Sequence, residues 1–269
     1  MLMKGFVLHH LNDWNNLPVM ERWFHREHAP DVKHQVPWLK QYHMYRAVNP
    51  APEGAEDFCY MNYRVHETIL DGMPPSMNGL PSMRFEPVEE AMNVAMYYVP
   101  VLPDRDLWGA QRRPFESPFI RWISVFKYPE EVDKQEAEDW YFNVHCPEVI
   151  KKAEKLVRYY SYNVFPAMMN AADMGHEQGI DGNFHLPFVE PPEYSLLRVP
   201  FDRMTEMWFE SGADWTRFVK EVAPTLTKPS WATQDAYPWV VPGKEFCSTF
   251  LLERPTEDLM ATSEAIYYG

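Results

Sequence analysis

The chain has 269 residues and a formal net charge of -14, with 46% hydrophobic and 15% aromatic residues. This acidic balance argues against nucleic acid or an anionic membrane surface as a partner, because both repel a negatively charged protein. No stretch approaches the about 18 apolar residues of a membrane span, and Cys59, Cys146 and Cys247 are too scattered for a disulfide framework, so we expect a soluble cytoplasmic protein with free thiols.

One stretch of the sequence occurs twice. Residues 23–32 and 140–149 share Trp, His, Pro and Val at the same places, and the offset of 117 residues holds without a gap between 3–49 and 120–166. A period this long is that of a small domain half, so we predict two fused copies of one unit. The identical pairs are Glu21/Glu138, Trp23/Trp140, His28/His145, Pro30/Pro147, Val32/Val149, Leu39/Leu156, Tyr42/Tyr159 and Tyr45/Tyr162.

Hydrophobic spacing and turn residues predict the same order of elements in each copy. In the first copy we expect strand 4–10, helix 18–32, strands 39–48 and 58–65, an eroded helix 71–83 and strand 94–101. In the second we expect strand 121–127, helix 133–152, strands 156–165 and 194–199, helix 213–222 and strand 245–252. Pro30 and Pro147 predict a break or kink beside each histidine.

The order β-α-β-β-α-β is the ferredoxin-like arrangement, so the predicted fold class is α+β with two tandem ferredoxin-like repeats. The long irregular insertion in the second repeat is interpreted as a lid over a pocket. The predicted boundaries are a first repeat over 1–101, a linker over 102–118, a second repeat over 119–254 with an insertion over 167–192, and a C-terminal tail over 255–269.

A strand, a helix with His-x-Pro near its end and a tyrosine-rich strand resemble the dimeric alpha+beta barrel superfamily, and within it the EthD-like branch. His28-Ala29-Pro30 and His145-Cys146-Pro147 carry this resemblance. In that superfamily two ferredoxin-like sheets meet across a dimer, so the resemblance implies an intrachain pseudo-dimer here. The chain is also similar to enzymes of bacterial lignin-aromatic catabolism that process methoxylated ring-cleavage products by isomerisation or methyl-ester hydrolysis.

The catalytic candidates are two histidines and two tyrosines. His28 and His145 qualify because an imidazole titrates near neutrality and transfers a proton without a cofactor. Tyr45 and Tyr162 are expected to stabilise an enolate or a tetrahedral oxyanion. The alternatives are rings that only end a helix or fill a barrel. If only one site is active, the second copy is favoured because it keeps its helix and has the insertion as a lid.

A second group of residues is predicted to bind the substrate. Arginines on strands in an acidic chain are expected to hold a carboxylate, although salt bridges to the chain's 39 acidic residues are the alternative. Aromatic and imidazole rings would complete the pocket, with core packing as their alternative. The substrate-binding candidates are Arg46, Arg121, Arg198, Tyr160, His43 and Trp140.

No metal and no cofactor are expected. His25 and His28 are spaced to face one ion together with His9, His10 or His43, but Phe142 replaces His25 in the second copy and the sequence contains no HExxH or CxxC. Haem ligation by a histidine, found in some relatives of the resembled family, is a further alternative.

The sequence therefore predicts a cofactor-independent isomerase or ester hydrolase that acts on a small carboxylated, aromatic-derived ring-cleavage compound by acid-base chemistry. A cofactor-free oxygenase or polyketide-type cyclase is one alternative. A non-catalytic ligand- or haem-binding module is the other. The expected partner is a small-molecule substrate, and a homodimer is left open.

Overall fold

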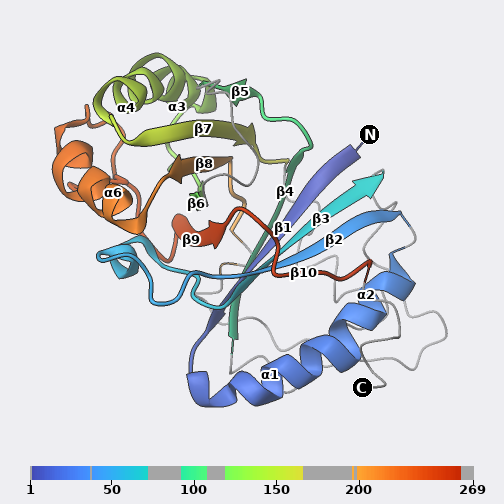
Figure 1. The fold of residues 1–269 in the computed structure, drawn as a ribbon. Coiled ribbons are helices and arrows are strands. Elements are labelled where there is room, and N and C mark those ends of the chain that lie inside the picture. The colour runs from blue at the N-terminus through green and yellow to red at the C-terminus, as the bar shows by residue number, and fades with distance from the viewer. Residues whose placement is uncertain are drawn as a thin grey trace.

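The computed structural model describes residues 2–36, 38–71, 92–107, 119–165, 196 and 199–261. Over these residues the chain forms two five-stranded antiparallel sheets with helices packed on one face of each (Figure 1). The predicted α+β class and the intrachain pseudo-dimer of two ferredoxin-like halves are confirmed.

The two halves contain corresponding elements. The first half comprises β1 (Leu2–Leu11), η1 (Trp14–Asn16), α1 (Leu17–Trp23), η2 (Phe24–His28), α2 (Ala29–Gln35), β2 (Leu39–Arg46), η3 (Ala55–Phe58), β3 (Arg64–Asp71) and β4 (Met92–Pro100). The second comprises β6 (Ile120–Phe126), α3 (Lys134–Trp140), η5 (Tyr141–His145), α4 (Cys146–Lys152), β7 (Leu156–Asn163), β8 (Arg203–Phe209), α6 (Gly212–Arg217), η7 (Phe218–Val222), η8 (Ala223–Thr225) and β9 (Phe246–Leu252). Two short strands are β5 (Arg105–Asp106) and β10 (Glu257–Asp258).

The third strand of each half was predicted too early in the chain. β3 and β8 begin at Arg64 and Arg203, whereas the expected ranges were 58–65 and 194–199. The backbone before β3 bonds instead to β9 of the other half, where Met61 N donates to Ser248 O at 2.7 Å. The helix predicted over 71–83 and the insertion over 167–192 lie outside the described residues, apart from residue 71 at the end of β3.

Each first helix contains a wide π-helical turn at its histidine instead of the predicted break. The turns are η2 and η5, and Pro30 and Pro147 follow in the first turn of α2 and α4. The chain stays helical because proline is tolerated in a first helical turn, where its missing N–H is not needed. Single π-helical turns are frequent at functional sites.

Each sheet takes its edge strand from the other half (Figure 1). β10 pairs with β2 through Glu257 and Met44, while β5 pairs with β7 through Arg105 and Ser161. Met44 and Ser161 are separated by the repeat offset of 117, so the two exchanges are equivalent. β5 lies in the segment expected to be a linker, and β10 lies in the expected tail.

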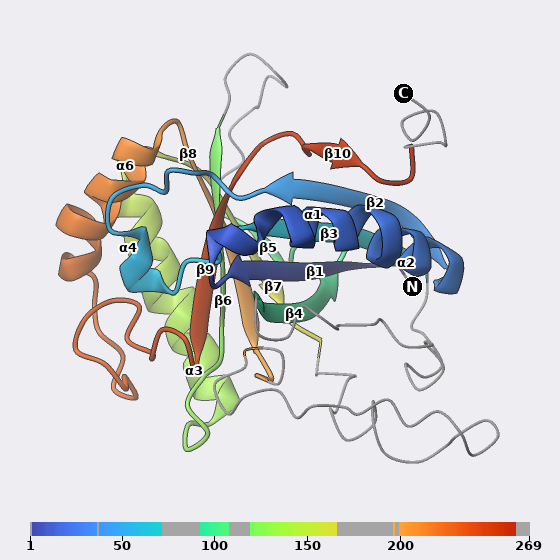
Figure 2. The same ribbon diagram turned by 90° about the horizontal axis from the view of Figure 1, so that it is seen from below.

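The two sheets are also joined at both remaining edges. Val48 N donates to Phe250 O at 2.9 Å, and Phe165 N donates to Tyr98 O at 2.9 Å. The first contact connects β2 to β9, and the second connects β7 to β4. The sheets therefore close into a barrel within one chain, and Figure 2 shows α1 and α2 outside it, over β1, β2 and β3.

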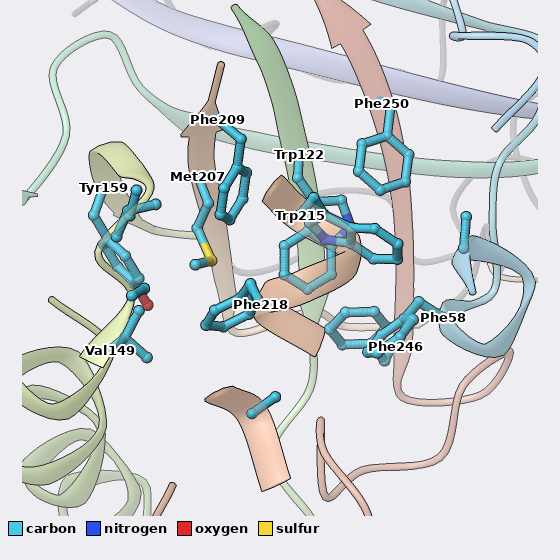
Figure 3. Packing of buried hydrophobic residues seen from close by; sticks show 14 of the residues in the cluster. Phe58, Trp122, Val149, Tyr159, Met207, Phe209, Trp215, Phe218, Phe246 and Phe250 are labelled. Atoms are coloured by element: carbon cyan, nitrogen blue, oxygen red, sulfur yellow. The ribbon is translucent and has the colours of Figure 1, made fainter. Parts of the chain in front are cut away.

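Buried residues form three cores: one under α1 and α2, one inside the barrel and one under α3, α4 and α6. Figure 3 shows the last of these, in which Trp122 and Phe250 stack with ring centres 6.3 Å apart. Phe58 comes from the first half, and its ring lies 5.6 Å from both Trp122 and Trp215. The halves therefore share a core and do not only touch. None of the helices in the described part of the chain has the length and apolarity of a membrane span.

We expect Leu259→Ala to lower the free energy of unfolding by about 2 to 4 kcal/mol, the usual cost of a buried Leu→Ala change. Leu259 follows β10, is 2% exposed and packs in the core under α1 and α2. Urea unfolding measures the change. Met260→Ala is the control, because Met260 is exposed and its loss is expected to change stability by no more than about 0.5 kcal/mol. Equal stability of the two variants would show that the tail does not stabilise the first half.

Candidate functional site

The four catalytic candidates occupy three separate places. His28 lies beside Trp23 on the helix side of the first sheet, and His145 lies beside Trp140 on the helix side of the second. Tyr45 and Tyr162 belong to the core inside the barrel, on the other face of the sheets. The side chains that do share the helix faces with the histidines are those of Tyr42 and Tyr159.

His28 belongs to a cluster of aromatic rings. It stacks on Trp23 with ring centres 4.7 Å apart. The His66 ring lies almost parallel to the His28 ring, with ring centres 5.8 Å apart. Phe24 lies 5.6 Å from His28 and 4.4 Å from His66. His28 is partly exposed, yet its Nδ1 is buried and has no hydrogen-bond partner among the described residues. Nδ1 is therefore not engaged by another group of the described chain, and the same holds for Nδ1 of His145.

Three imidazoles of the first half are held neutral. Burial, with Arg64 nearby, lowers the pKa of His28 to about 4. Burial likewise lowers the pKa of His9 to about 3 and the pKa of His66 well below its usual value. The His9 and His66 rings are 4.5 Å apart, and His9 Nδ1 lies 3.3 Å from Arg64 O.

Arg64 provides a buried positive charge in this cluster. The side chain is 1% exposed, and its guanidinium lies 4.1 Å from the centre of the Phe24 ring. Its Nη2 donates to Glu21 and to Tyr63. Its Nε and Nη1 are buried and have no hydrogen-bond partner among the described residues. Buried donors of this kind are uncommon and require an explanation.

Glu21 forms ion pairs with Arg64 and with Arg46, which was predicted to bind the substrate. Arg46 donates to both carboxylate oxygens of Glu21, at 3.2 and 3.1 Å. Burial alone would raise the pKa of Glu21, but Arg64, Tyr63 and Arg46 lower it to about 2. Arg46 is therefore already paired with a carboxylate of the chain.

The histidine of the second half is enclosed by aromatic rings. His145 is 5% exposed and is stacked by Trp140 at 5.4 Å and by Tyr237 at 6.0 Å. Trp239 meets its edge at 5.6 Å. Burial lowers the pKa of His145 to about 4. Its environment is much less accessible than that of His28.

Hydroxyl groups near His145 are hydrogen-bonded to one another, but His145 Nδ1 and Trp140 Nε1 are buried and have no hydrogen-bond partner among the described residues. The Tyr141 hydroxyl lies 2.8 Å from both the Tyr159 hydroxyl and Thr205 Oγ1. Burial raises the pKa of Cys146 to about 12, so this thiol stays protonated and is a poor nucleophile.

The barrel interior holds a second charged cluster. Arg121 Nε donates to Glu206 at 2.7 Å and Arg121 Nη2 lies 3.7 Å from Glu67, which Lys4 also approaches at 3.5 Å. Burial alone would lower the pKa of Arg121, but Glu206 and Glu67 raise it well above its usual value. Arg121 is therefore bound by two carboxylates of the chain. Burial raises the pKa of nearby Tyr45 to about 12.

The remaining candidates lie apart from these clusters. His43 is 3.0 Å from Gln41 Nε2 and 3.9 Å from Asp258. Tyr160 packs partly buried against the barrel core, 6.2 Å from Tyr162. Arg198 lies outside the described residues. Among the residues that the structure describes, no group of three or more histidine, cysteine or acidic side chains has the geometry of a metal site.

Sequence reasoning did not single out His9, His66, Arg64 or Glu21 as site residues. His9 appeared only as a metal ligand, and Glu21 only as an identical pair with Glu138. A signal was present for two of them, because Arg64 and His66 alternate along one strand and so share a face. The early placement of the third strand hid that pattern.

A family model described as "Chalcone isomerase N-terminal domain" matches residues 1–111, which is less than half of the chain. A search of curated proteins finds no match. Three solved structures are similar to this chain. An anthrone oxidase-like protein is 10% identical with a TM-score of 0.47, over 96% of this chain and 93% of the other. A chlorite dismutase variant from Candidatus Nitrospira defluvii with cyanide is 11% identical with a TM-score of 0.43, over 93% of this chain and 90% of the other, and a candidate monooxygenase from Lactobacillus acidophilus NCFM is 10% identical with a TM-score of 0.33, over 96% and 97%.

The predicted reaction class, isomerisation or methyl-ester hydrolysis of a carboxylated ring-cleavage compound, is wrong. The three structures bear the names of an oxidase, a dismutase and a monooxygenase, and none is named as an isomerase or an ester hydrolase. The geometry supplies a physical reason, because the predicted carboxylate anchors Arg46 and Arg121 are already paired with glutamates. The narrower resemblance to the EthD-like branch stays a prediction.

We expect the free energy of unfolding to fall as the pH is lowered from about 6.5 to 4. An unfolded histidine binds a proton near pH 6.5, whereas the pKa of folded His28 is about 4, so the unfolded state binds more protons in this window. His28→Gln removes one such proton and makes the fall shallower by up to about 1.4 kcal/mol per pH unit. Urea unfolding at a series of pH values measures the slope. Val19→Ala, which removes no titrating group, should keep the wild-type slope, and a wild-type slope in His28→Gln would contradict the account.

Proposed function

We propose that the first half is a cofactor-free oxygenase site, in which His28 takes an acidic C–H or O–H proton from an aromatic substrate and leaves an enolate or a phenolate. The observation that carries this proposal is the exposure of the His28 imidazole: it is neutral and partly exposed, whereas His145, which is also neutral and has the same unpartnered Nδ1, is 5% exposed. A neutral imidazole is the form that accepts a proton. The rings of Trp23 and Phe24 beside it suit an aromatic substrate.

The chemistry needs only dioxygen as a co-reactant. His28 removes a proton from an acidic C–H group of the substrate, as in the CH₂ of an anthrone, and leaves a delocalised anion. That anion gives its electrons to O₂, and a C–O bond forms to a peroxide, which takes the proton back from His28. Loss of water, which carries away the second C–H proton, leaves a ketone. One O₂ is consumed, and one oxygen atom enters the product while the other leaves as water.

Ring closure of the same anion, the cyclase alternative, is the second candidate. The match of residues 1–111 to a family named for chalcone isomerase favours it, because that segment includes His9, His28 and His66. A chalcone is a diaryl enone, so a phenolate in the same molecule can add to its double bond. The new O–C bond leaves an enolate, which takes the proton back from His28. The two candidates share the ionisation step and differ in what the anion then attacks.

The test uses the protein without metal or haem, anthrone and a 2'-hydroxychalcone as substrates, and an oxygen electrode together with absorbance. We expect oxygen uptake with anthrone. His28→Gln should reduce the rate about 10²- to 10⁴-fold, the usual contribution of a general base. The matched control is His145→Gln, which alters the corresponding histidine in the enclosed second half and should keep the wild-type rate.

Other outcomes would contradict the oxygenase. Loss of chalcone absorbance without oxygen uptake would move the assignment to the cyclase. Silence with both compounds would favour a non-catalytic ligand-binding module. A haem absorbance band in the protein as purified would favour the haem-binding alternative.

A further inference from the structure

Two buried arginines occupy equivalent places in the two halves. Arg64 pairs across the sheet with Arg46, and Arg203 pairs with Asn163. Residues 46 and 163 are related by the repeat offset of 117. Each arginine also binds the glutamate of its own first helix, Glu21 for Arg64 and Glu138 for Arg203. Differences between the two arginines therefore show how the halves have diverged.

All three nitrogens of the Arg203 guanidinium are hydrogen-bonded. Nε donates to Glu138 at 2.9 Å, Nη1 donates to Ser161 at 2.6 Å, and both Nη1 and Nη2 donate to Asp104 at 3.0 Å. Asp104 precedes β5, the strand contributed by the first half. In the second half, the segment that contains Asp104 and β5 therefore supplies the last hydrogen-bond acceptor of Arg203.

Arg64 lacks the two partners that complete Arg203. The strand registers place Met44 where the second half has Ser161, and Thr256 where it has Asp104. Thr256 instead accepts a bond from the backbone N of Arg46. As a result Arg64 Nε and Nη1 have no partner among the described residues, although the side chain is 1% exposed.

The charges differ in the same direction. In the first half two guanidiniums, Arg64 and Arg46, face the single carboxylate of Glu21. In the second half Arg203 faces the two carboxylates of Glu138 and Asp104. The three imidazoles near Arg64 are neutral at pH 7, so they add no charge to this cluster. In the ion pairs of the described residues, two guanidiniums of the first cluster therefore share one carboxylate, and the next acid, Glu257, approaches His25 at 4.0 Å.

We propose that Arg64 is the anion-binding residue of the first half, and that its free Nε and Nη1 donate to the oxygen of a phenolate or enolate bound beside His28. Charge-assisted hydrogen bonds from a buried guanidinium suit such an oxygen. This inference rests on the proposed function, because it names the group that holds the anion which His28 creates.

The inferred role also resolves an energetic mismatch. His28, whose pKa is about 4, is a weak base for a phenol with an ordinary pKa near 10. A cation within a few ångströms lowers the pKa of an acid by about 1 to 3 units. Arg64 therefore brings the substrate's acidity closer to that of the imidazole, and it stabilises the anion after the proton has moved.

The test measures binding, not turnover. The probes are 4-nitrophenol, whose anion has its own absorbance band, and 4-nitroanisole, an uncharged molecule of similar shape. We expect the wild-type protein to bind the anion in preference to the ether. Arg64→Met should weaken anion binding about 10- to 100-fold and leave ether binding unchanged, as expected for the loss of charge-assisted bonds. Arg64→Lys, which keeps the charge, should restore part of the preference.

A second variant tests the idea without removing Arg64. Thr256→Asp places a carboxylate where the second half has Asp104, so it should occupy the free donors and abolish the anion preference. Thr256→Asn, of the same shape but uncharged, should keep that preference. If Arg64→Met fails to fold, judged by circular dichroism, the two Thr256 variants decide.

The outcomes separate this inference from the proposed function. A folded Arg64→Met protein that binds 4-nitrophenolate as tightly as the wild type would overturn the role of Arg64, whatever the oxygen assay shows. Anion binding that depends on Arg64, in a protein that turns over no substrate, would support the role of Arg64 and defeat the oxygenase. An unchanged anion preference in Thr256→Asp would also count against Arg64 as the anion-binding residue.

Discussion

Closure of the barrel within a single chain is the constraint on which the rest of this structure depends. The bonds from Val48 N to Phe250 O and from Phe165 N to Tyr98 O join the two sheets at equivalent points. Because each sheet also takes an edge strand from the other half, neither has all its strands without its partner. The inner faces are used for closure, so each half keeps a separate helix-covered face outside the barrel. Two corresponding sites can therefore diverge without disturbing the core inside the barrel.

The divergence is visible in how each half satisfies its buried polar groups. In the second half Asp104 and Ser161 complete Arg203, and aromatic rings enclose His145. In the first half Nε and Nη1 of Arg64 are left without partners among the described residues, whereas Nδ1 is unpartnered in both His28 and His145. An unpaired buried polar group costs about 1 to 3 kcal/mol, so such a cluster is expected where a ligand completes it. The half whose buried arginine keeps unpaired donors is thus the better candidate for binding an anion.

Much of the architecture could be predicted from the sequence, because the 117-residue offset links every element from β1 to β2 with its copy. The closed barrel followed from that repeat and from the resemblance to known folds. The exchanged strands β5 and β10 could not be predicted, since two residues carry no periodicity and their pairing depends on the other half. The position of β3 was missed because residues before it bond to β9, a long-range contact that local patterns do not reveal.

The site residues proposed from the structure differ from those that the sequence favoured, for the same reason. Alternation correctly separated Tyr42 from Tyr45, but it did not reveal which face meets the helices, and the tyrosines chosen lie inside the barrel. The sequence favoured His145 because its copy keeps its helix and was expected to have the insertion as a lid. In the structure, aromatic rings enclose this imidazole. Accessibility depends on residues such as Tyr237, far away in the sequence and close in space.

The central claim is that the first half binds a ligand and the second does not. Nitrogen-15 NMR of the imidazole rings during addition of 4-nitrophenol tests it most directly, because each histidine reports separately. The account predicts that the resonances of His28 and His66 move while the resonance of His145 stays in place. Movement of His145 with His28 and His66 unchanged would contradict it.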